Sequence, residues 1–303
     1  MRRTFLAVLV LGLLAPLLVA ADEPAPDPLA TVGVIDTGIN PYHVRFRDDS
    51  PRAFEHPSSY IPGYPEDAQA LNLTLDASSY QEAVATDRAV WESVQPDTLY
   101  WIPGTRIVGA KTDGSYGGQI LDTDGHGTMA ASRVAAGPVA DSEAAEVYGA
   151  CPDCLIVVLQ GLNEDHVRWA GETGWIDAQT NSWGPLPVAG WADGTPLGTD
   201  SEDIEAAAQL HPTVFATGNG ILAMAGVLGN PTITQNELTP SVIGVGGHDS
   251  GYVNTWPDFP PHVVSDSCDA WGAEHNSLEG EGPEVAGGTS GASPFAAGMS
   301  ANM

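Results

Sequence analysis

Short apolar runs that stop abruptly at polar residues or glycines recur along this chain and limit its fold more than any other feature. They cover residues 31–35, 155–159, 214–216 and 242–245, and the more polar residues 178–183 are a further strand candidate. Apolar, β-branched runs of this length are typical of strands that are buried on both faces of a sheet. Helical patterns separate them, one near 203–210 and one in the small-residue stretch that follows His126. We therefore predict an α/β fold, a three-layer α/β/α arrangement with a mainly parallel central sheet.

A long polar segment interrupts this alternation. Between about residues 41 and 104 the hydrophobic periodicity is weak and proline, tyrosine and aspartate are scattered through the segment. We interpret it as an insertion that carries one helix near residues 79–94. The insertion also contains Asn72-Leu73-Thr74, a sequon that becomes an N-glycosylation acceptor only in a suitable host.

The N-terminal segment has the layout of a secretory signal peptide. Two arginines precede an apolar run over residues 5–19, which ends in Ala20 and Ala21. The alternative is a membrane anchor, but the run is shorter than the roughly 20 residues that a spanning helix needs. We expect a signal peptide at 1–21, a Pro-rich acidic linker at 22–30, and a secreted, extracellular domain at 31–303 without a stable membrane anchor.

The charge balance excludes one class of partner. The chain has 39 acidic residues against 10 basic ones, a formal net charge of -29. Such a surface repels nucleic acids and anionic membranes, so we expect no nucleic-acid partner. Lys111 is the only lysine. Two explanations of this composition stay open, a protein adapted to strong salt and an ordinary acidic secreted protein.

Three cysteines are present, and two of them are close together. Cys151 and Cys154 form a Cys-x-x-Cys pair, and Cys268 stands apart. A zinc site needs about four ligands, and no second pair of cysteines exists. In an exported protein we expect a Cys151–Cys154 disulfide, with Cys268 unpaired. The alternative is that the thiols are reduced and buried.

Four short segments carry residue types that belong to hydrolytic chemistry. Asp36 ends the first apolar run, His126 lies between two glycines, Asn219 lies in Gly-Asn-Gly, and Ser290 lies in Gly-Thr-Ser-Gly. Taken singly, each has a structural explanation as a turn residue or a helix N-cap. Taken together, the order Asp, His, Ser matches one of the arrangements in which a serine nucleophile is activated by a histidine that an aspartate orients.

These segments resemble the motifs of the subtilase family. The resemblance rests on Val-Gly-Val-Ile-Asp-Thr-Gly-Ile (32–39), Asp-Gly-His-Gly-Thr (124–128), Asn-Ser-Trp-Gly (181–184), Pro-Ser-Val-Ile (240–243) and Gly-Thr-Ser-Gly-Ala-Ser-Pro (288–294). It implies a subtilisin-like peptidase domain over 31–303. It also implies a serine endopeptidase of broad specificity that acts on protein or peptide substrates, with Asp36, His126 and Ser290 as the catalytic triad.

The resemblance implies further roles. Asn219 would donate a hydrogen bond to the oxyanion of the tetrahedral intermediate. Extended substrate would pair with a strand edge, and the substrate-binding residues would be Ser182, Trp183, Gly184, Ala216, Thr217 and Gly218. A position in the core is an equal interpretation of Trp183. The chemistry needs no cofactor. Many subtilases hold structural calcium, and Asp113, Asp122 and Asp124 offer oxygen ligands, but their spacing marks no particular site.

The sequence departs from the family pattern at three positions near the triad. Met129 and Phe295 each stand where the family usually has histidine, and Gly291 stands where it usually has methionine. The chain also ends at Met303, soon after Ser290. These departures leave an alternative open, a catalytically inactive subtilase-like binding module or an incomplete fragment. An esterase is disfavoured because Ser290 lacks a Gly-x-Ser-x-Gly elbow.

Overall fold

The structure of the 303-residue chain is a computed structural model. It describes residues 29–115, 119–137, 149–183, 201–216, 241–249, 252–253, 263–266, 272–273, 276–278, 281–282 and 288–303. The predicted signal peptide, most of the predicted linker, and Cys268 lie outside these residues. Within the described part of the chain, no helix is long and apolar enough to cross a bilayer.

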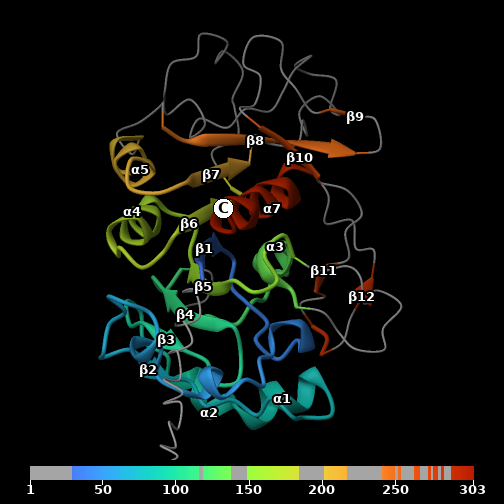
Figure 1. Cartoon of the computed structure of the whole chain (residues 1–303). Coiled ribbons are helices and arrows are strands. Elements are labelled where there is room, and N and C mark those ends of the chain that lie inside the picture. The colour runs from blue at the N-terminus through green and yellow to red at the C-terminus, as the bar shows by residue number, and fades with distance from the viewer. Residues whose placement is uncertain are drawn as a thin grey trace, which may run out of the picture.

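One large sheet forms the centre of the molecule (Figure 1). In spatial order its main path is β10 (Val263–Asp266), β8 (Ile243–Asp249), β7 (Thr213–Ala216), β6 (Ala178–Asn181), β1 (Thr31–Asp36), β5 (Leu155–Gln160), β4 (Ile107–Thr112), β3 (Tyr100–Trp101) and β2 (Gln69–Ala70). From β10 to β4 every neighbouring pair is parallel. β3 is antiparallel to β4, and β9 (Tyr252–Val253) is antiparallel to β8. A separate hairpin joins β11 (Gly272–Ala273) to β12 (Glu281–Gly282).

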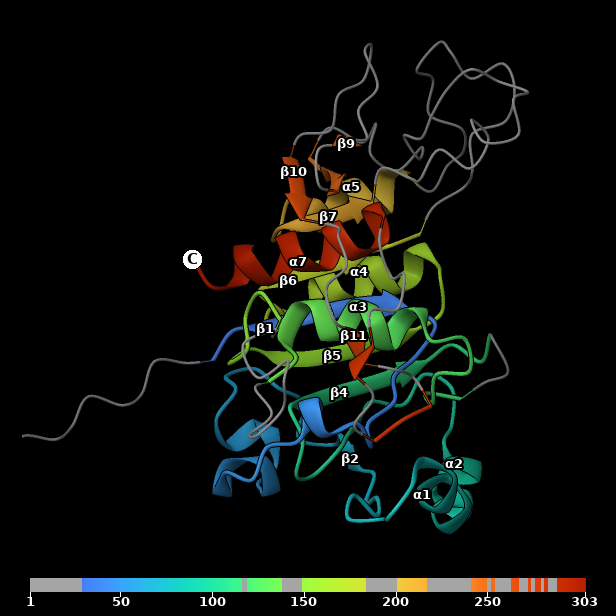
Figure 2. The same ribbon diagram turned by 90° about the vertical axis from the view of Figure 1, so that its right-hand side faces the viewer.

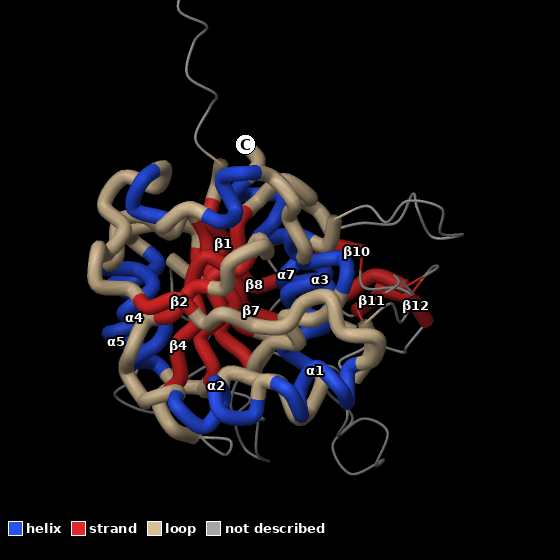
Figure 3. The backbone as a smooth tube through the Cα atoms, turned by 90° about the horizontal axis from the view of Figure 1, so that it is seen from below, coloured by secondary structure: helices blue, strands red, loops and turns tan. Residues whose placement is uncertain are grey.

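Helices cover both faces of the sheet. α3 (His126–Ala135) and α7 (Thr289–Ala301) lie on one face, and α4 (Glu164–Glu172) and α5 (Ser201–Ala208) lie on the other (Figures 1 and 3). α4 and α5 approach closely, since a Cβ on Gly171 would lie 2.7 Å from the Ala207 Cβ. The predicted three-layer α/β/α fold with a mainly parallel sheet is confirmed.

β1 shows why its sequence is apolar without alternation. Val32 and Val34 belong to the core cluster that contains the alanines of α3 and α7. Ile35 points to the opposite side, into the cluster that contains Ala170 of α4 and Ile176. All three side chains have no exposed surface. A central parallel strand must fill two cores, so every position is apolar until the strand ends.

The insertion at 41–104 packs against the β4 side of the sheet. It contains three 3-10 helices, η1 (Val44–Phe46), η2 (Pro51–Phe54) and η3 (Pro57–Ser59), and it supplies the edge strands β2 and β3. Its helical part differs from the prediction of one helix at 79–94. The structure has α1 (Tyr80–Thr86) and α2 (Arg88–Ser93), separated at Asp87.

The break between α1 and α2 has a polar cause. The Asp87 carboxylate is buried and accepts hydrogen bonds from the Tyr42 hydroxyl (2.8 Å), the Thr74 backbone N–H (2.7 Å) and the Thr74 hydroxyl (2.7 Å). Asp87 itself leaves the helical conformation, with φ −90° and ψ 13°. A buried carboxylate needs such donors, and their positions turn the chain here.

Candidate active site

The topology defines where a site would form. β1 lies between β5 and β6 in the sheet. On the β5 side the sheet continues to β4, β3 and β2, and on the β6 side it continues to β7, β8 and β10. This is the point where the strand order reverses, and in open α/β sheets ligands bind outside the carboxyl ends of the strands at such a point. Asp36 is the last residue of β1, and Ser182 follows β6 directly. The register pairs Ile35 with Asn181, so Asp36 and Ser182 end neighbouring strands.

Asp36 and His126 form the first half of the site. The Asp36 side chain is 1 % exposed, and its Oδ1 lies 2.7 Å from Nδ1 of His126. The same oxygen accepts the backbone N–H of Thr37 at 2.8 Å. Asp36 Oδ2 is buried without a hydrogen-bond partner among the described residues. His126 is therefore the cationic partner available to this carboxylate when its ring is protonated.

The environment of His126 changes its titration. Burial lowers the pKa of the imidazole, but the adjacent Asp36 carboxylate outweighs this effect, with smaller contributions from Asp124 and Asp122, and the pKa rises to about 9. The side chain remains 32 % exposed. A ring that is oriented through Nδ1 and is partly exposed can take a proton at Nε2 from a hydroxyl that comes within hydrogen-bonding distance.

A close backbone contact fixes the start of α3. Gly125 precedes His126 with φ 103°, a conformation that favours glycine. The next glycine, Gly127, lies so near the loop after β1 that a Cβ on it would be 2.3 Å from the Gly38 carbonyl oxygen. The glycines that flank His126 thus let the helix start approach the end of β1.

Ser290 lies in the first turn of α7. Its hydroxyl is 3.4 Å from the Ser182 carbonyl oxygen, and the Ser182 hydroxyl donates to the Ser290 carbonyl at 2.9 Å. A second contact one turn later joins the buried hydroxyls of Ser293 and Thr180 of β6 at 2.9 Å. α7 is therefore tied to the end of β6, beside the strand that carries Asp36.

α3 and α7 lie side by side (Figure 2). Arg133 of α3 donates through Nε to the Gly291 carbonyl at 3.4 Å and lies over the Phe295 ring, 5.2 Å from its centroid. Gly298 allows the close approach, since a Cβ there would be 3.1 Å from the Val134 carbonyl oxygen. Phe295, which replaces the family's usual histidine, thus packs against the helix that begins with His126.

The other predicted site residues divide into two groups. Gly184, Thr217, Gly218 and Asn219 lie outside the described residues. Ala216 ends β7 and is buried. The Trp183 indole donates to the Ile35 carbonyl at 3.0 Å, and its ring contacts Phe215 edge to face at 5.6 Å. Trp183 therefore fastens the segment after β6 to β1 and to the core.

Three residues without a predicted catalytic role join the loop after β1 to the start of α3. Asp122, Thr37 and Thr128 are buried, and both threonine hydroxyls donate to the Asp122 carboxylate. The sequence signal for Asp122 is its position four residues before His126, and from the sequence it was predicted only to offer oxygen ligands, without a placed calcium site. Among the described residues, no group of three or more His, Cys, Asp or Glu side chains is arranged to hold a metal ion.

Cys151 and Cys154 form a disulfide that closes a tight turn before β5. The turn contacts the end of α7, where a Cβ on Gly298 would lie 3.0 Å from the Ala150 Cβ. The disulfide therefore supports the turn on which α7 rests.

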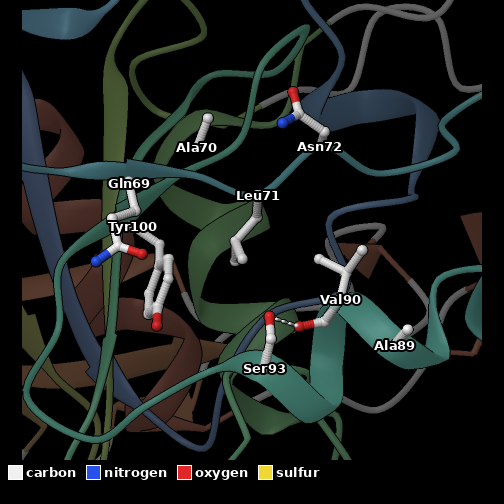
Figure 4. Close-up of a pocket in the computed structure, with 8 residues that line it drawn as sticks. All are labelled: Gln69, Ala70, Leu71, Asn72, Ala89, Val90, Ser93 and Tyr100. Atoms are coloured by element: carbon white, nitrogen blue, oxygen red, sulfur yellow. Dashed lines mark hydrogen bonds between the residues drawn. The ribbon is translucent and has the colours of Figure 1, made fainter.

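A pocket of about 420 Å³ lies far from these residues, at the β2 edge of the sheet (Figure 4). Leu71 and Val90 supply apolar surface, and the Ser93 hydroxyl that borders it donates to the Val90 carbonyl at 2.7 Å. The side chains that line it include no His, Cys, Asp, Glu, Lys or Arg, so it offers no acid, base or thiolate.

Solved structures with some similarity to this chain are known. The chain is similar in structure to MycP1 with its N-terminal propeptide removed (17% identity over 90% of this chain and 77% of that chain, TM-score 0.42). It is also similar to the nisin leader peptidase NisP from Lactococcus lactis (17%, 90% and 76%, TM-score 0.44). A third similar structure is the epidermin leader peptide processing serine protease EpiP from Staphylococcus aureus (14%, 90% and 65%, TM-score 0.47). No curated protein matches the sequence.

The family assignment rests on the match between the sequence and a family model. The model of the subtilase family, Peptidase_S8, matches residues 29–303, which include every strand and helix described above. This chain belongs to the subtilase family and is a serine-type peptidase.

Proposed function

We propose that this protein is a secreted serine endopeptidase of broad specificity that cleaves peptide bonds through Asp36, His126 and Ser290. The observation that carries the proposal is the 2.7 Å contact between Asp36 and His126 at the end of β1. Ser290 is tied to the end of the neighbouring strand β6. In this proposal Asp36, His126 and Ser290 supply an orienting acid, a base and a nucleophile at the carboxyl ends of β1 and β6.

The chemistry follows from what each group can do. Neutral His126 accepts the Ser290 hydroxyl proton at Nε2 while Oγ bonds to the carbonyl carbon of the scissile peptide. The imidazolium then gives this proton to the leaving amine nitrogen, the C–N bond breaks, and an acyl-enzyme remains on Ser290. A water molecule, deprotonated by His126, attacks the ester carbonyl carbon. The bond between this carbon and Ser290 Oγ then breaks, the imidazolium returns its proton to Oγ, and the acid product leaves. Asp36 holds the ring through Nδ1–H and stabilises the imidazolium in both halves.

The tetrahedral intermediate needs donors for its oxyanion. The backbone N–H of Ser290 lies in the first turn of α7, where the helix dipole favours negative charge. The family motif assigns the second donor to the Asn219 side chain. Loss of one such donor typically costs about 3 to 4 kcal/mol of transition-state stabilisation. We therefore expect Asn219→Ala to lower kcat by about 100- to 1,000-fold with little change in KM.

The substrate is an extended peptide in this proposal. It pairs through backbone hydrogen bonds with residues 182–184, a form of recognition that reads few side chains. The anchored Trp183 supports this interpretation because it holds the segment in place through Ile35. Cleavage at many positions of an unfolded protein follows, whereas a processing protease would cut at one or a few sites.

Casein hydrolysis and cleavage-site mapping on a peptide library test the function. Wild-type protein should cleave both at many sites. Ser290→Ala and His126→Ala should each lower kcat by about 10⁴-fold or more, and the double variant should lose no more than either single one, since the residues act as a unit. Folded wild-type protein that cleaves nothing would favour the inactive binding module. Cleavage at one motif would retain the peptidase and exclude broad specificity.

Export has its own test. Expression with the first 21 residues in a secreting host should yield extracellular protein whose N-terminus lies at or near Asp22. Protein that keeps residues 1–21 and stays with the membrane would show that the segment is an anchor.

A further inference from the structure

Asp122 is a buried carboxylate whose oxygens face protein donors. The residue is 1 % exposed. Its Oδ1 accepts the Thr37 hydroxyl (3.0 Å) and the backbone N–H groups of Asp124 (3.0 Å) and Gly125 (2.9 Å). Its Oδ2 accepts the backbone N–H and the hydroxyl of Thr128 at 2.8 and 2.6 Å. These five hydrogen bonds make the Asp122 carboxylate an organising acceptor for the loop and the helix start.

Thr37 links this carboxylate to Asp36. Its backbone N–H donates to Asp36 Oδ1, the oxygen that also contacts His126. Its hydroxyl donates to Asp122 and accepts the backbone N–H of Gly127 at 2.8 Å. The Thr37 side chain therefore contacts Gly127, the residue after His126. The Thr37 backbone contacts Asp36, the carboxylate that orients His126.

The same side chains satisfy the start of α3. The first N–H groups of a helix have no partner within the helix. Here the Gly127 N–H donates to Thr37, and the Thr128 N–H donates to Asp122. Thr128 in turn uses its hydroxyl to accept the Asn40 backbone N–H at 3.0 Å. Thr37 belongs to the loop after β1, and Asp122 belongs to the loop that precedes α3. Their hydrogen bonds to the first N–H groups of α3 therefore also fix the position of α3 relative to β1.

We propose that Asp122, Thr37 and Thr128, the Asp122 clamp, form a positioning unit that holds His126 at hydrogen-bonding distance from Asp36. The clamp residues act through the triad and do not touch substrate. This inference rests on the proposed function, because it assigns the clamp to the catalytic step of that reaction. Thr37 and Thr128 each form a hydrogen bond between the loop after β1 and the start of α3, and the Asp122 carboxylate accepts a hydrogen bond from both hydroxyls.

The clamp acts on rate more than on substrate affinity. A shift of about 1 Å in the base or its orienting acid can cost about 100-fold in rate. In the proposed function substrate binds along residues 182–184, and the contacts of Ser182 and Trp183 in the described part of this segment are with Ser290, Ile35 and Phe215. We therefore expect Thr37→Val, which keeps the shape and removes the hydroxyl, to lower kcat by about 10- to 100-fold and to change KM by less than about twofold.

Two conservative variants complete the set. Thr37→Ser keeps the hydroxyl and should restore kcat to within about threefold of wild type. Asp122→Asn turns two acceptor positions into donors that face N–H and O–H groups, so it should lower kcat at least as much as Thr37→Val. The two substitutions share one network, so their combined loss should be smaller than the product of the single losses.

Thr105→Val is the matched control. Thr105 is buried, as Thr37 is, and its hydroxyl donates to the Ile102 carbonyl at 2.8 Å and accepts the Ile107 N–H at 3.0 Å, at the start of β4 away from the site. It should lower the thermal midpoint as Thr37→Val does and leave kcat per folded molecule within about twofold of wild type.

Proton NMR gives a readout that needs no turnover. The wild-type protein should show a far-downfield signal for the His126 Nδ1–H in its hydrogen bond with Asp36, identified by its absence in His126→Ala. The signal should persist in Thr37→Ser and Thr105→Val and shift upfield or broaden in Thr37→Val and Asp122→Asn.

The proposed function and the Asp122 clamp can be contradicted separately. Wild-type protein that shows the signal and does not cleave casein would contradict the proposed function alone. Active wild-type protein whose folded Thr37→Val and Asp122→Asn variants keep both kcat and the signal would overturn the clamp alone. Should Asp122→Asn not fold, Thr37→Val against Thr37→Ser decides the matter, because they differ from each other only at the hydroxyl and one methyl group.

Discussion

Gly127→Ala tests whether the contact between α3 and the loop after β1 controls the active site. The new Cβ would lie 2.3 Å from the Gly38 carbonyl oxygen, 2.7 Å from the Gly38 nitrogen and 3.1 Å from the Thr37 nitrogen. All three are backbone atoms, so no side chain can rotate away. An ordinary contact begins at about 3.4 Å, and the helix start must therefore separate from the loop by about 1 Å.

This separation acts directly on the neighbouring residue. His126 precedes Gly127, and its 2.7 Å contact with Asp36 spans the same gap. A displacement of about 1 Å lengthens the contact beyond hydrogen-bonding distance, and such misplacement costs about 100-fold in rate. Overpacking costs about 1 to 3 kcal/mol of unfolding free energy, offset by up to about 1 kcal/mol because alanine favours helix more than glycine does.

Gly171→Ala in α4 is the matched control for this variant. Its Cβ would lie 2.7 Å from the Ala207 Cβ and 2.8 Å from the Ala207 Cα, on the opposite face of the sheet. Steady-state kinetics on a peptide substrate and thermal unfolding should show a similar loss of stability in both variants and a loss of kcat only in Gly127→Ala. Unchanged kcat in a folded Gly127→Ala protein would refute the reasoning.

Three further predictions follow from charge and covalent structure. Because His126 must be neutral to act as a base and its pKa is raised to about 9, kcat/KM should rise with pH up to about pH 9. A plateau of kcat/KM from pH 7 upward would contradict this prediction. The stabilisation of the folded state by protonated His126 changes with pH in the opposite direction. It is fully present below about pH 6.5 and is lost as the pH rises past about 9. Replacing Cys151 and Cys154 with serine together should lower the unfolding free energy by roughly 2 kcal/mol, measured by denaturant titration, since the closed loop is short; no change would show that the turn holds without the bond. With 39 acidic residues against 10 basic ones, the thermal midpoint and activity should rise from about 0.1 M to about 1 M salt as repulsion is screened, and a flat or falling response would remove adaptation to strong salt as the explanation.

The central sheet was predictable because its signal is local. β1, β5 and β7 must fill cores on two faces, so their interior positions are mostly apolar, and their observed bounds lie within one residue of the predicted ones. α4 was not predicted, although Asn163 caps it by accepting the His166 N–H at 2.9 Å and two acidic residues follow the cap. Its polar, mixed sequence gives a weak hydrophobic periodicity, so the pattern alone does not predict a helix. Packing against α5 stabilises α4 in the folded protein.

The candidate site was predictable in its motifs and not in its connections. Asp36, His126 and Ser290 could be chosen because each lies in a short recognisable segment. The role of Asp122 depends on two segments, 36–40 and 122–128, that meet only in the folded chain. The same holds for Asp87, whose partners Tyr42 and Thr74 lie far from it in the sequence and divide one predicted helix into two.

Mapping the adduct of a fluorophosphonate probe tests the central claim most directly. The probe reacts with a serine that a neighbouring base activates, and mass spectrometry of the digested protein identifies the residue. We predict one adduct on Ser290, absent from Ser290→Ala and formed at least about 100-fold more slowly in His126→Ala. Folded wild-type protein that forms no adduct, or one that carries it on another serine, would contradict the assignment.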